Sequence, residues 1–96
     1  MINQVFQALS DPTRREILRL LRSGDKSAGE ISRRFRLAKS TLSGHFNVLK
    51  SAGLILPERR GTTILYSLNV TAAEDALTAL MDMIHGPSSR VKEKNR

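Results

Sequence analysis

The central stretch of the chain reads Ala38-Lys-Ser-Thr-Leu-Ser-Gly-His-Phe-Asn-Val-Leu-Lys-Ser-Ala-Gly53. If this stretch is a helix, one side of it is apolar and carries Leu42, Phe46 and Leu49. The opposite side carries only small or polar residues, namely Ser40, Gly44 and Asn47. A helix with such an outer side can lie close to the major groove of DNA, which is wide enough to admit one helix. The alternative is an ordinary amphipathic surface helix, and the flanking sequence has to distinguish the two.

A second short helix is predicted just before this one. Ser27-Ala-Gly-Glu30 has the spacing of a capping box, in which the Ser and Glu side chains each bond the other residue's backbone amide. The helix that follows would turn Ala28, Ile31 and Phe35 inward, and residues 36–38 would form a tight connection. Two short helices joined in this way, the second with a polar outer side, predict a helix-turn-helix.

Two further helices are predicted at the start of the chain. The spacing of Ile2, Val5, Phe6 and Leu9 indicates a short amphipathic first helix. Asp11-Pro12 then supplies an N-cap acceptor followed by a proline at the first helical position, so a second helix should run from there to about Arg22. This helix would turn Ile17, Leu18 and Leu21 inward and leave Leu20 half-buried.

After Gly53 the apolar pattern changes to that of β-strands. Residues 54–58 and 64–68 predict two strands, joined by a loop over residues 59–63. Pro57 cannot donate to a β-ladder, so it marks an edge strand. A hairpin with Arg59 and Arg60 near its tip can straddle a phosphate backbone; the alternative is an ordinary basic turn.

A final helix is expected from an N-cap at Thr71, with Glu74 completing a capping box, to about His85. A domain of this size has little spare core to cover amphipathic helices at both ends. We therefore expect the first and last helices to form a self-association surface, although both could instead belong to the core. The expected interface residues are Val5, Phe6, Leu9, Ala73, Leu77, Leu80, Met83 and Ile84. Residues 87–96 should form a flexible basic tail after a single domain over residues 1–86.

The charge is concentrated around the central stretch. The chain has a net charge of +7, and residues 33–60 alone carry a net +6, whereas residues 61–86 carry −3. A localised basic zone is the footprint expected for contacts to phosphates, although a generally solubilising surface is the alternative. The chain has no cysteine, no apolar run of membrane-spanning length and no visible signal peptide, so a cytoplasmic protein is expected.

The chain resembles the ArsR/SmtB family of bacterial winged-helix repressors over residues 3–86, most closely its short SdpR-type autorepressor branch. The motifs are Leu9–Leu18, Ser40–Leu49, Ala52–Ile55, Arg60-Gly61 and Tyr66–Leu68. The resemblance implies a mainly α fold with a small β-hairpin, a winged helix-turn-helix of four helices, two strands and a fifth helix. It also implies a dimer formed through the first and last helices. By the same resemblance, Ser40, Thr41, Ser43 and His45 would contact the groove or phosphates, and residues 59–63 would form the wing.

Three features depart from the family pattern. Ala38 stands where family members often have a serine cap, which predicts a less firmly started helix. Gly44 stands where relatives usually carry a long base-reading side chain, so we expect either close approach of the backbone to DNA or weaker base readout. The family's metal-ligand positions fall on Ser27, Val70, Ala72, Met83 and Gly86. These offer no thiolate, imidazole or carboxylate, so no metal and no cofactor are expected.

The sequence thus predicts a dimeric, sequence-specific DNA-binding repressor that reads a palindromic operator with half-sites about 34 Å apart. The resemblance implies that it is an autorepressor. The expected DNA contacts are Lys39, Ser40, Thr41, Ser43, Gly44, His45, Asn47, Arg59, Arg60, Thr62 and Thr63. An enzyme is not expected, because no carboxylate is placed to orient His45 for activating Ser43. Two alternatives stay open: an adaptor whose basic surface meets an acidic protein, and a repressor that responds to a small apolar ligand at the dimer interface.

Overall fold

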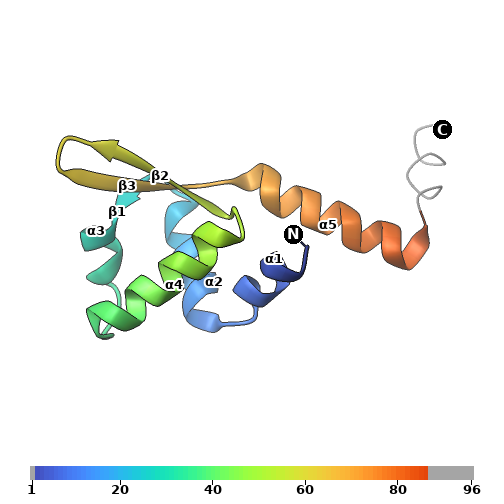
Figure 1. The fold of residues 1–96 in the computed structure, drawn as a ribbon, viewed down its shortest axis with the longest axis horizontal. Coiled ribbons are helices and arrows are strands. Elements are labelled where there is room, and N and C mark those ends of the chain that lie inside the picture. Colours follow the sequence, from blue (N-terminus) through green and yellow to red (C-terminus); the bar gives the residue numbers. More distant parts are fainter. Residues whose placement is uncertain (1, 87–96) are drawn as a thin grey trace.

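The computed structural model of the protein describes residues 2–86 (Figure 1). Its elements in chain order are α1 (Ile2–Leu9), α2 (Pro12–Leu21), β1 (Lys26–Ser27), α3 (Ala28–Ser32), α4 (Lys39–Ser51), β2 (Ile55–Arg60), β3 (Thr63–Leu68) and α5 (Val70–His85). The predicted fold class, a mainly α winged helix-turn-helix, is confirmed. The predicted tail over residues 87–96 lies outside the described residues.

Side-chain caps start the second and third helices where the sequence predicts them. The Asp11 carboxylate accepts from the backbone N–H groups of Thr13 (2.7 Å) and Arg14 (3.1 Å), and Pro12 follows at the first helical position. Ser27 and Glu30 form the predicted capping box, with distances of 3.1 and 2.8 Å. By contrast, α4 starts at Ala38 without a side-chain cap, as expected for alanine.

The sheet contains a third strand that the sequence analysis missed. β1 pairs with β3, Lys26 opposite Tyr66 and Ser27 opposite Leu65, so the strand order is β1-β3-β2. The prediction of a two-stranded wing was therefore incomplete. A two-residue strand has no periodicity of its own, and its pairing depends on a partner almost forty positions away. Pro57 lies in β2, which is an edge strand as predicted.

The hairpin is longer and its turn tighter than expected. Arg60 pairs with Thr63, so only Gly61 and Thr62 form the turn, and the prediction of a loop over residues 59–63 was wrong. Gly61 has a φ of +64°, a conformation that suits a two-residue hairpin turn and that glycine adopts without strain.

The last helix begins two residues earlier than expected and with a different cap. The Asn69 side chain accepts from the backbone N–H of Ala72 (3.4 Å) and donates to the carbonyl of Gly53 (2.8 Å). Its backbone N–H also donates to the carbonyl of Leu54. The predicted capping box at Thr71 and Glu74 was wrong, because Asn69 both caps α5 and ties it to the end of α4.

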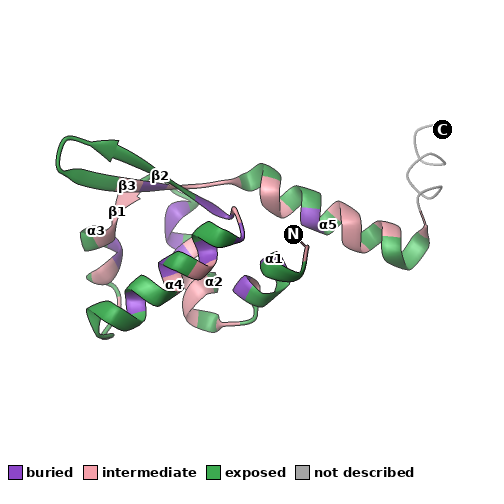
Figure 2. Cartoon of the chain, in the orientation of Figure 1, coloured by how far each residue is buried: buried purple, intermediate pink, exposed green. Residues whose placement is uncertain are grey.

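The core lies where α1, α2, α4 and the base of the hairpin meet (Figure 2). The rings of Phe46 and Tyr66 stack there with centroids 5.0 Å apart. Leu20 is buried and Leu18 only partly so, the reverse of the prediction, because α2 packs through Ile17, Leu20 and Leu21. The third helix ends at Ser32, so Phe35 reaches the core from the following loop.

Candidate nucleic-acid interface

The candidate reading surface is the outer side of α4. The three predicted anchor residues Leu42, Phe46 and Leu49 are all buried, which fixes the rotation of the helix about its axis. Solvent-facing positions on α4 include Lys39, Ser40, Thr41, Ser43, Gly44 and Asn47. None of these is acidic or a large apolar residue, so this surface can approach a polyanion closely.

Gly44 lies in the middle of this surface with open space above it. A Cβ atom built on Gly44 meets no heavy atom within 4 Å. No neighbour within the protomer therefore requires glycine here, although a mid-helix glycine costs about 0.5–1 kcal/mol relative to alanine.

His45 differs from these exposed positions because it is half-buried. Its Nδ1 atom lies 3.1 Å from Nη1 of Arg14, in the first turn of α2. Arg14 also donates from Nε to the carbonyl of Ala8 (2.8 Å) and from Nη2 to that of Gln7 (3.0 Å). Arg14 therefore joins α1, α2 and α4 directly behind the candidate reading surface.

The sequence analysis did not identify Arg14 as a residue near the candidate site, although its position in the sequence is unusual. Arg14 and Arg15 stand in the first turn of α2, where positive charge opposes the helix dipole. The last carbonyls of a helix lack partners within the helix, and here the two arginines supply donors to those of α1. Arg15 donates to the carbonyl of Leu9 (2.7 Å), and Arg14 donates to those of Ala8 and Gln7.

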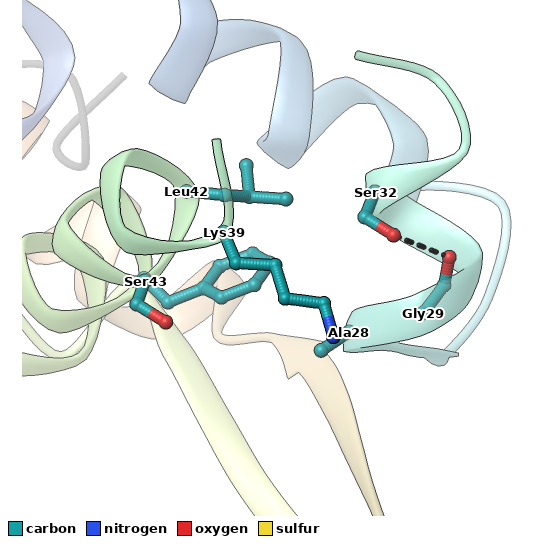
Figure 3. Close-up of a pocket in the computed structure, with 7 residues that line it drawn as sticks. Ala28, Gly29, Ser32, Lys39, Leu42 and Ser43 are labelled. Carbon is teal, nitrogen blue, oxygen red and sulfur yellow. Dashed lines mark hydrogen bonds between the residues drawn. The ribbon is translucent and has the colours of Figure 1, made fainter. Parts of the chain in front are cut away.

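A shallow pocket of about 260 Å³ lies between α3 and α4 (Figure 3). Leu42, Phe46 and Ala28 supply its apolar lining, and Ser32 and Ser43 are polar groups around it. Figure 3 shows the Lys39 side chain extending from α4 toward Ala28 on α3. This places a cation between the two helices of the helix-turn-helix, beside the exposed first turn of α4.

The two arginines of the wing lie on opposite faces of the hairpin. They are consecutive residues of β2, and successive side chains of a strand point to opposite faces. The Nε atom of Arg60 lies 3.2 Å from Oε2 of Glu58 in an exposed ion pair. No ion pair of Arg59 is found within residues 2–86. Thr62 stands in the turn and Thr63 at the start of β3, and both are exposed.

The predicted interface residues divide into two groups. Val5 is buried in the protomer's own core, Leu9 and Ala73 pack partly against that core, and Leu80 is half-buried. The remaining residues are open to solvent, with exposed fractions of 38% for Phe6, 58% for Leu77, 71% for Met83 and 65% for Ile84. They lie along α1 and along α5, which projects away from the rest of the fold (Figure 1). An uncovered apolar row of this kind indicates an interaction surface.

Residues 11–56 match the family model described as bacterial regulatory protein, arsR family. The chain is also 45% identical over 84 residues to the transcriptional repressor SdpR of Bacillus subtilis, a match that covers 88% of this chain and 93% of that protein. The chain belongs to the ArsR family. It is therefore a DNA-binding transcriptional regulator rather than an enzyme, as the sequence predicted.

Other transcriptional regulators are similar over most of the chain. The arsenical resistance operon repressor of Staphylococcus xylosus is 34% identical, over 71% of this chain and 65% of that protein. The transcriptional activator HlyU of Vibrio cholerae is 30% identical, over 84% and 71% respectively. Among solved structures, an ArsR-like regulator from Rhodococcus sp. RHA1 superposes with a TM-score of 0.80 at 28% identity, covering 96% of this chain and 87% of that one.

The structure places the residues that the family resemblance aligns with metal ligands in different surroundings. Ser27 caps α3, Ala72 packs partly against the core, and Val70 and Met83 are exposed. Over residues 2–86 no group of three or more His, Cys, Asp or Glu side chains is gathered as a metal site. Within the same residues no helix is long and apolar enough to cross a membrane.

Proposed function

We propose that this protein is a homodimeric, sequence-specific transcriptional repressor that silences its own gene or operon from the cytoplasm. Each protomer would insert α4 into the major groove of one half of a palindromic operator and set its β2–β3 hairpin on the neighbouring phosphates. The half-sites would lie about one helical turn apart, roughly 34 Å. Repression rather than activation is supported by the greater identity to SdpR, 45%, than to the activator HlyU, 30%.

The observation that carries the proposal is the contrast between the two sides of α4. Its inner side carries the buried Leu42, Phe46 and Leu49, whereas its outer side has neutral hydroxyl and amide groups, an uncovered glycine and Lys39. Hydroxyl and amide side chains both bond phosphates and reach base edges. The proposed contacts are Lys39, Ser40, Thr41, Ser43, Gly44, His45 and Asn47 on α4, and Arg59, Arg60, Thr62 and Thr63 on the wing.

Dimer formation is supported by the surface that a single protomer leaves uncovered. The apolar side chains of Phe6, Leu77, Met83 and Ile84 are exposed on the two helices that the family resemblance assigns to the interface. Burying apolar surface contributes about 25 cal/mol per Å², so packing these side chains against a second protomer is favourable. Leu9, Ala73 and Leu80 would border the contact, and Val5 would support α1 from inside the protomer.

The test is selection of duplexes from a random pool with the purified full-length protein. We expect enrichment of a palindrome with half-sites one turn apart, and an affinity whose logarithm falls linearly with the logarithm of salt concentration. If no duplex is enriched and salt has no effect on binding, the adaptor for an acidic protein is the better description.

A second candidate, a repressor that also responds to a small apolar ligand, is favoured by one observation. A pocket of about 150 Å³ lies between α1 and α5, lined by Ile2, Val5, Ala76 and Ala79 with Asp75 among them. Apolar cavities of about 150 Å³ can hold a molecule such as benzene. A ligand that binds the folded protein must raise its melting temperature, so melts with small aromatic compounds test this candidate.

A further inference from the structure

The guanidinium of Arg14 is the best-connected polar group that the proposed function leaves unused. Three of its nitrogens are engaged, two with the last carbonyls of α1 and one with the Nδ1 atom of His45 on α4. A cation held by two carbonyls cannot swing away without losing those bonds. The two bonds to α1 therefore hold the Arg14 guanidinium in place for its third contact, to the Nδ1 atom of His45 on α4.

We propose that Arg14 is a positioning residue for DNA recognition, which acts by fixing the ring orientation and tautomer of His45. This inference rests on the proposed function, because it specifies how one of the proposed DNA contacts is prepared. It concerns a residue outside both the reading helix and the wing.

The tautomer follows from the donor inventory of the two side chains. Arginine carries only N–H donors and has no acceptor. The ring nitrogen that meets it at 3.1 Å must accept, so Nδ1 of His45 carries no proton. In a neutral imidazole the proton then resides on Nε2, which leaves that nitrogen as a donor.

A fixed Nε2 donor has a defined set of partners on DNA. It can bond a phosphate oxygen, or the acceptors of the major groove, which are N7 of purines, O6 of guanine and O4 of thymine. It cannot bond the amino groups of adenine or cytosine, which are donors themselves. Without Arg14 the ring can rotate and place the proton on either nitrogen, so this selectivity is lost.

Arg15 offers a matched control. It is the next residue of α2, carries the same charge and donates to the carbonyl of Leu9 at 2.7 Å, so it also anchors the end of α1. The hydrogen bonds of the described residues join Arg14, but not Arg15, to His45. Arg14→Gln and Arg15→Gln remove the same charge. Arg14→Gln cuts two bonds to α1 and Arg15→Gln cuts one, but only Arg14→Gln removes the contact to the imidazole.

The first experiment measures operator affinity for Arg14→Gln, Arg15→Gln, His45→Ala and the Arg14→Gln/His45→Ala double variant at one salt concentration. We expect Arg14→Gln and His45→Ala each to weaken binding about tenfold, the value of one good charge-assisted hydrogen bond. The double variant should bind no more weakly than His45→Ala, and Arg15→Gln should stay within about threefold of the wild type. If the Nε2 partner is a base acceptor rather than a phosphate, both variants should also lose discrimination at the same operator base pair. Additive losses, or an equal loss in Arg15→Gln, would overturn the proposal.

The second experiment needs neither DNA nor a variant. Two-bond ¹H–¹⁵N spectra of the full chain report which ring nitrogen of a neutral imidazole carries the proton. We expect His45 to show the Nε2–H tautomer alone, with the exposed His85 as the internal reference for a free ring. A mixture at His45 equal to that at His85, or a proton on Nδ1, would overturn the inference even if the protein binds its operator. Failure of duplex selection with the expected tautomer would instead count against the proposed function.

Discussion

Replacing Gly44 by alanine should make the protein more stable and a weaker DNA binder. Gly44 lies inside α4, where glycine costs about 0.5–1 kcal/mol relative to alanine. Because the added Cβ meets no atom within 4 Å in the protomer, nothing opposes this gain in stability. For a domain of this size the melting temperature should rise by about 2–8 °C. In the proposed complex the same methyl group would stand between α4 and the groove floor, and we expect affinity for the operator to fall about tenfold.

The assay compares thermal melts and fluorescence-anisotropy titrations of the variant and the wild type at the same protein concentration, since a dimer's melting temperature depends on concentration. Ser51→Ala is the control, because Ser51 is exposed in the last turn of α4 and its replacement also favours helix. Ser51→Ala should leave affinity unchanged. If Gly44→Ala raises stability and binds DNA as tightly as the wild type, the backbone at Gly44 does not approach the groove. If it lowers stability, the space above Gly44 is occupied and the reasoning fails.

Three further predictions concern the wing, the interface and the caps. Arg59→Ala should weaken binding to all duplexes and reduce the slope of log K against log salt by about one; an unchanged slope would exclude Arg59 from phosphate contact. Leu77→Glu should give monomers in sedimentation velocity and abolish operator binding, and a variant that stays dimeric would contradict the α5 interface. Burial acts to raise the pKa of Asp11, but hydrogen bonds from the backbone of Arg14 and Thr13 outweigh it and lower that pKa below 3.8. The pKa of Glu30 is held below 4.5, mainly by the backbone N–H of Ser27. Both carboxylates therefore stabilise the fold above their unfolded pKa values and lose this effect as pH falls through the lower folded ones. The urea concentration at the unfolding midpoint, measured from pH 7 to pH 2.5, should fall as these carboxylates become protonated. The double variant Asp11→Asn/Glu30→Gln should show a smaller fall.

Local patterns were enough to predict most of the fold. The Asp11-Pro12 start and the Ser27–Glu30 capping box depend only on residues a few positions apart, and both form as expected. The same holds for the Leu42, Phe46 and Leu49 stripe, which needs only helical periodicity to be recognised. The family assignment drew on the order and spacing of several such motifs.

Several features that the sequence did not reveal depend on contacts between distant residues. β1 exists because Lys26 and Ser27 lie beside β3, and Asn69 displaces Thr71 as the cap because its amide also reaches Gly53. Arg14 and His45 are 31 positions apart on different helices, so no helical spacing pattern connects them. The choice between core and interface for Val5 and Leu77 likewise required the packed structure, since both belong to equally apolar helical patterns.

In the proposed autorepressor, the exposed apolar side chains of α5 would make repression depend on the protein's own abundance. In the proposed dimer, pairing removes Leu77, Met83 and Ile84 from water, and at low abundance the amount of paired protein grows with the square of the protomer concentration. A gene silenced by its own product through such a step keeps being transcribed while the product is scarce, and then shuts off over a narrow range of concentration.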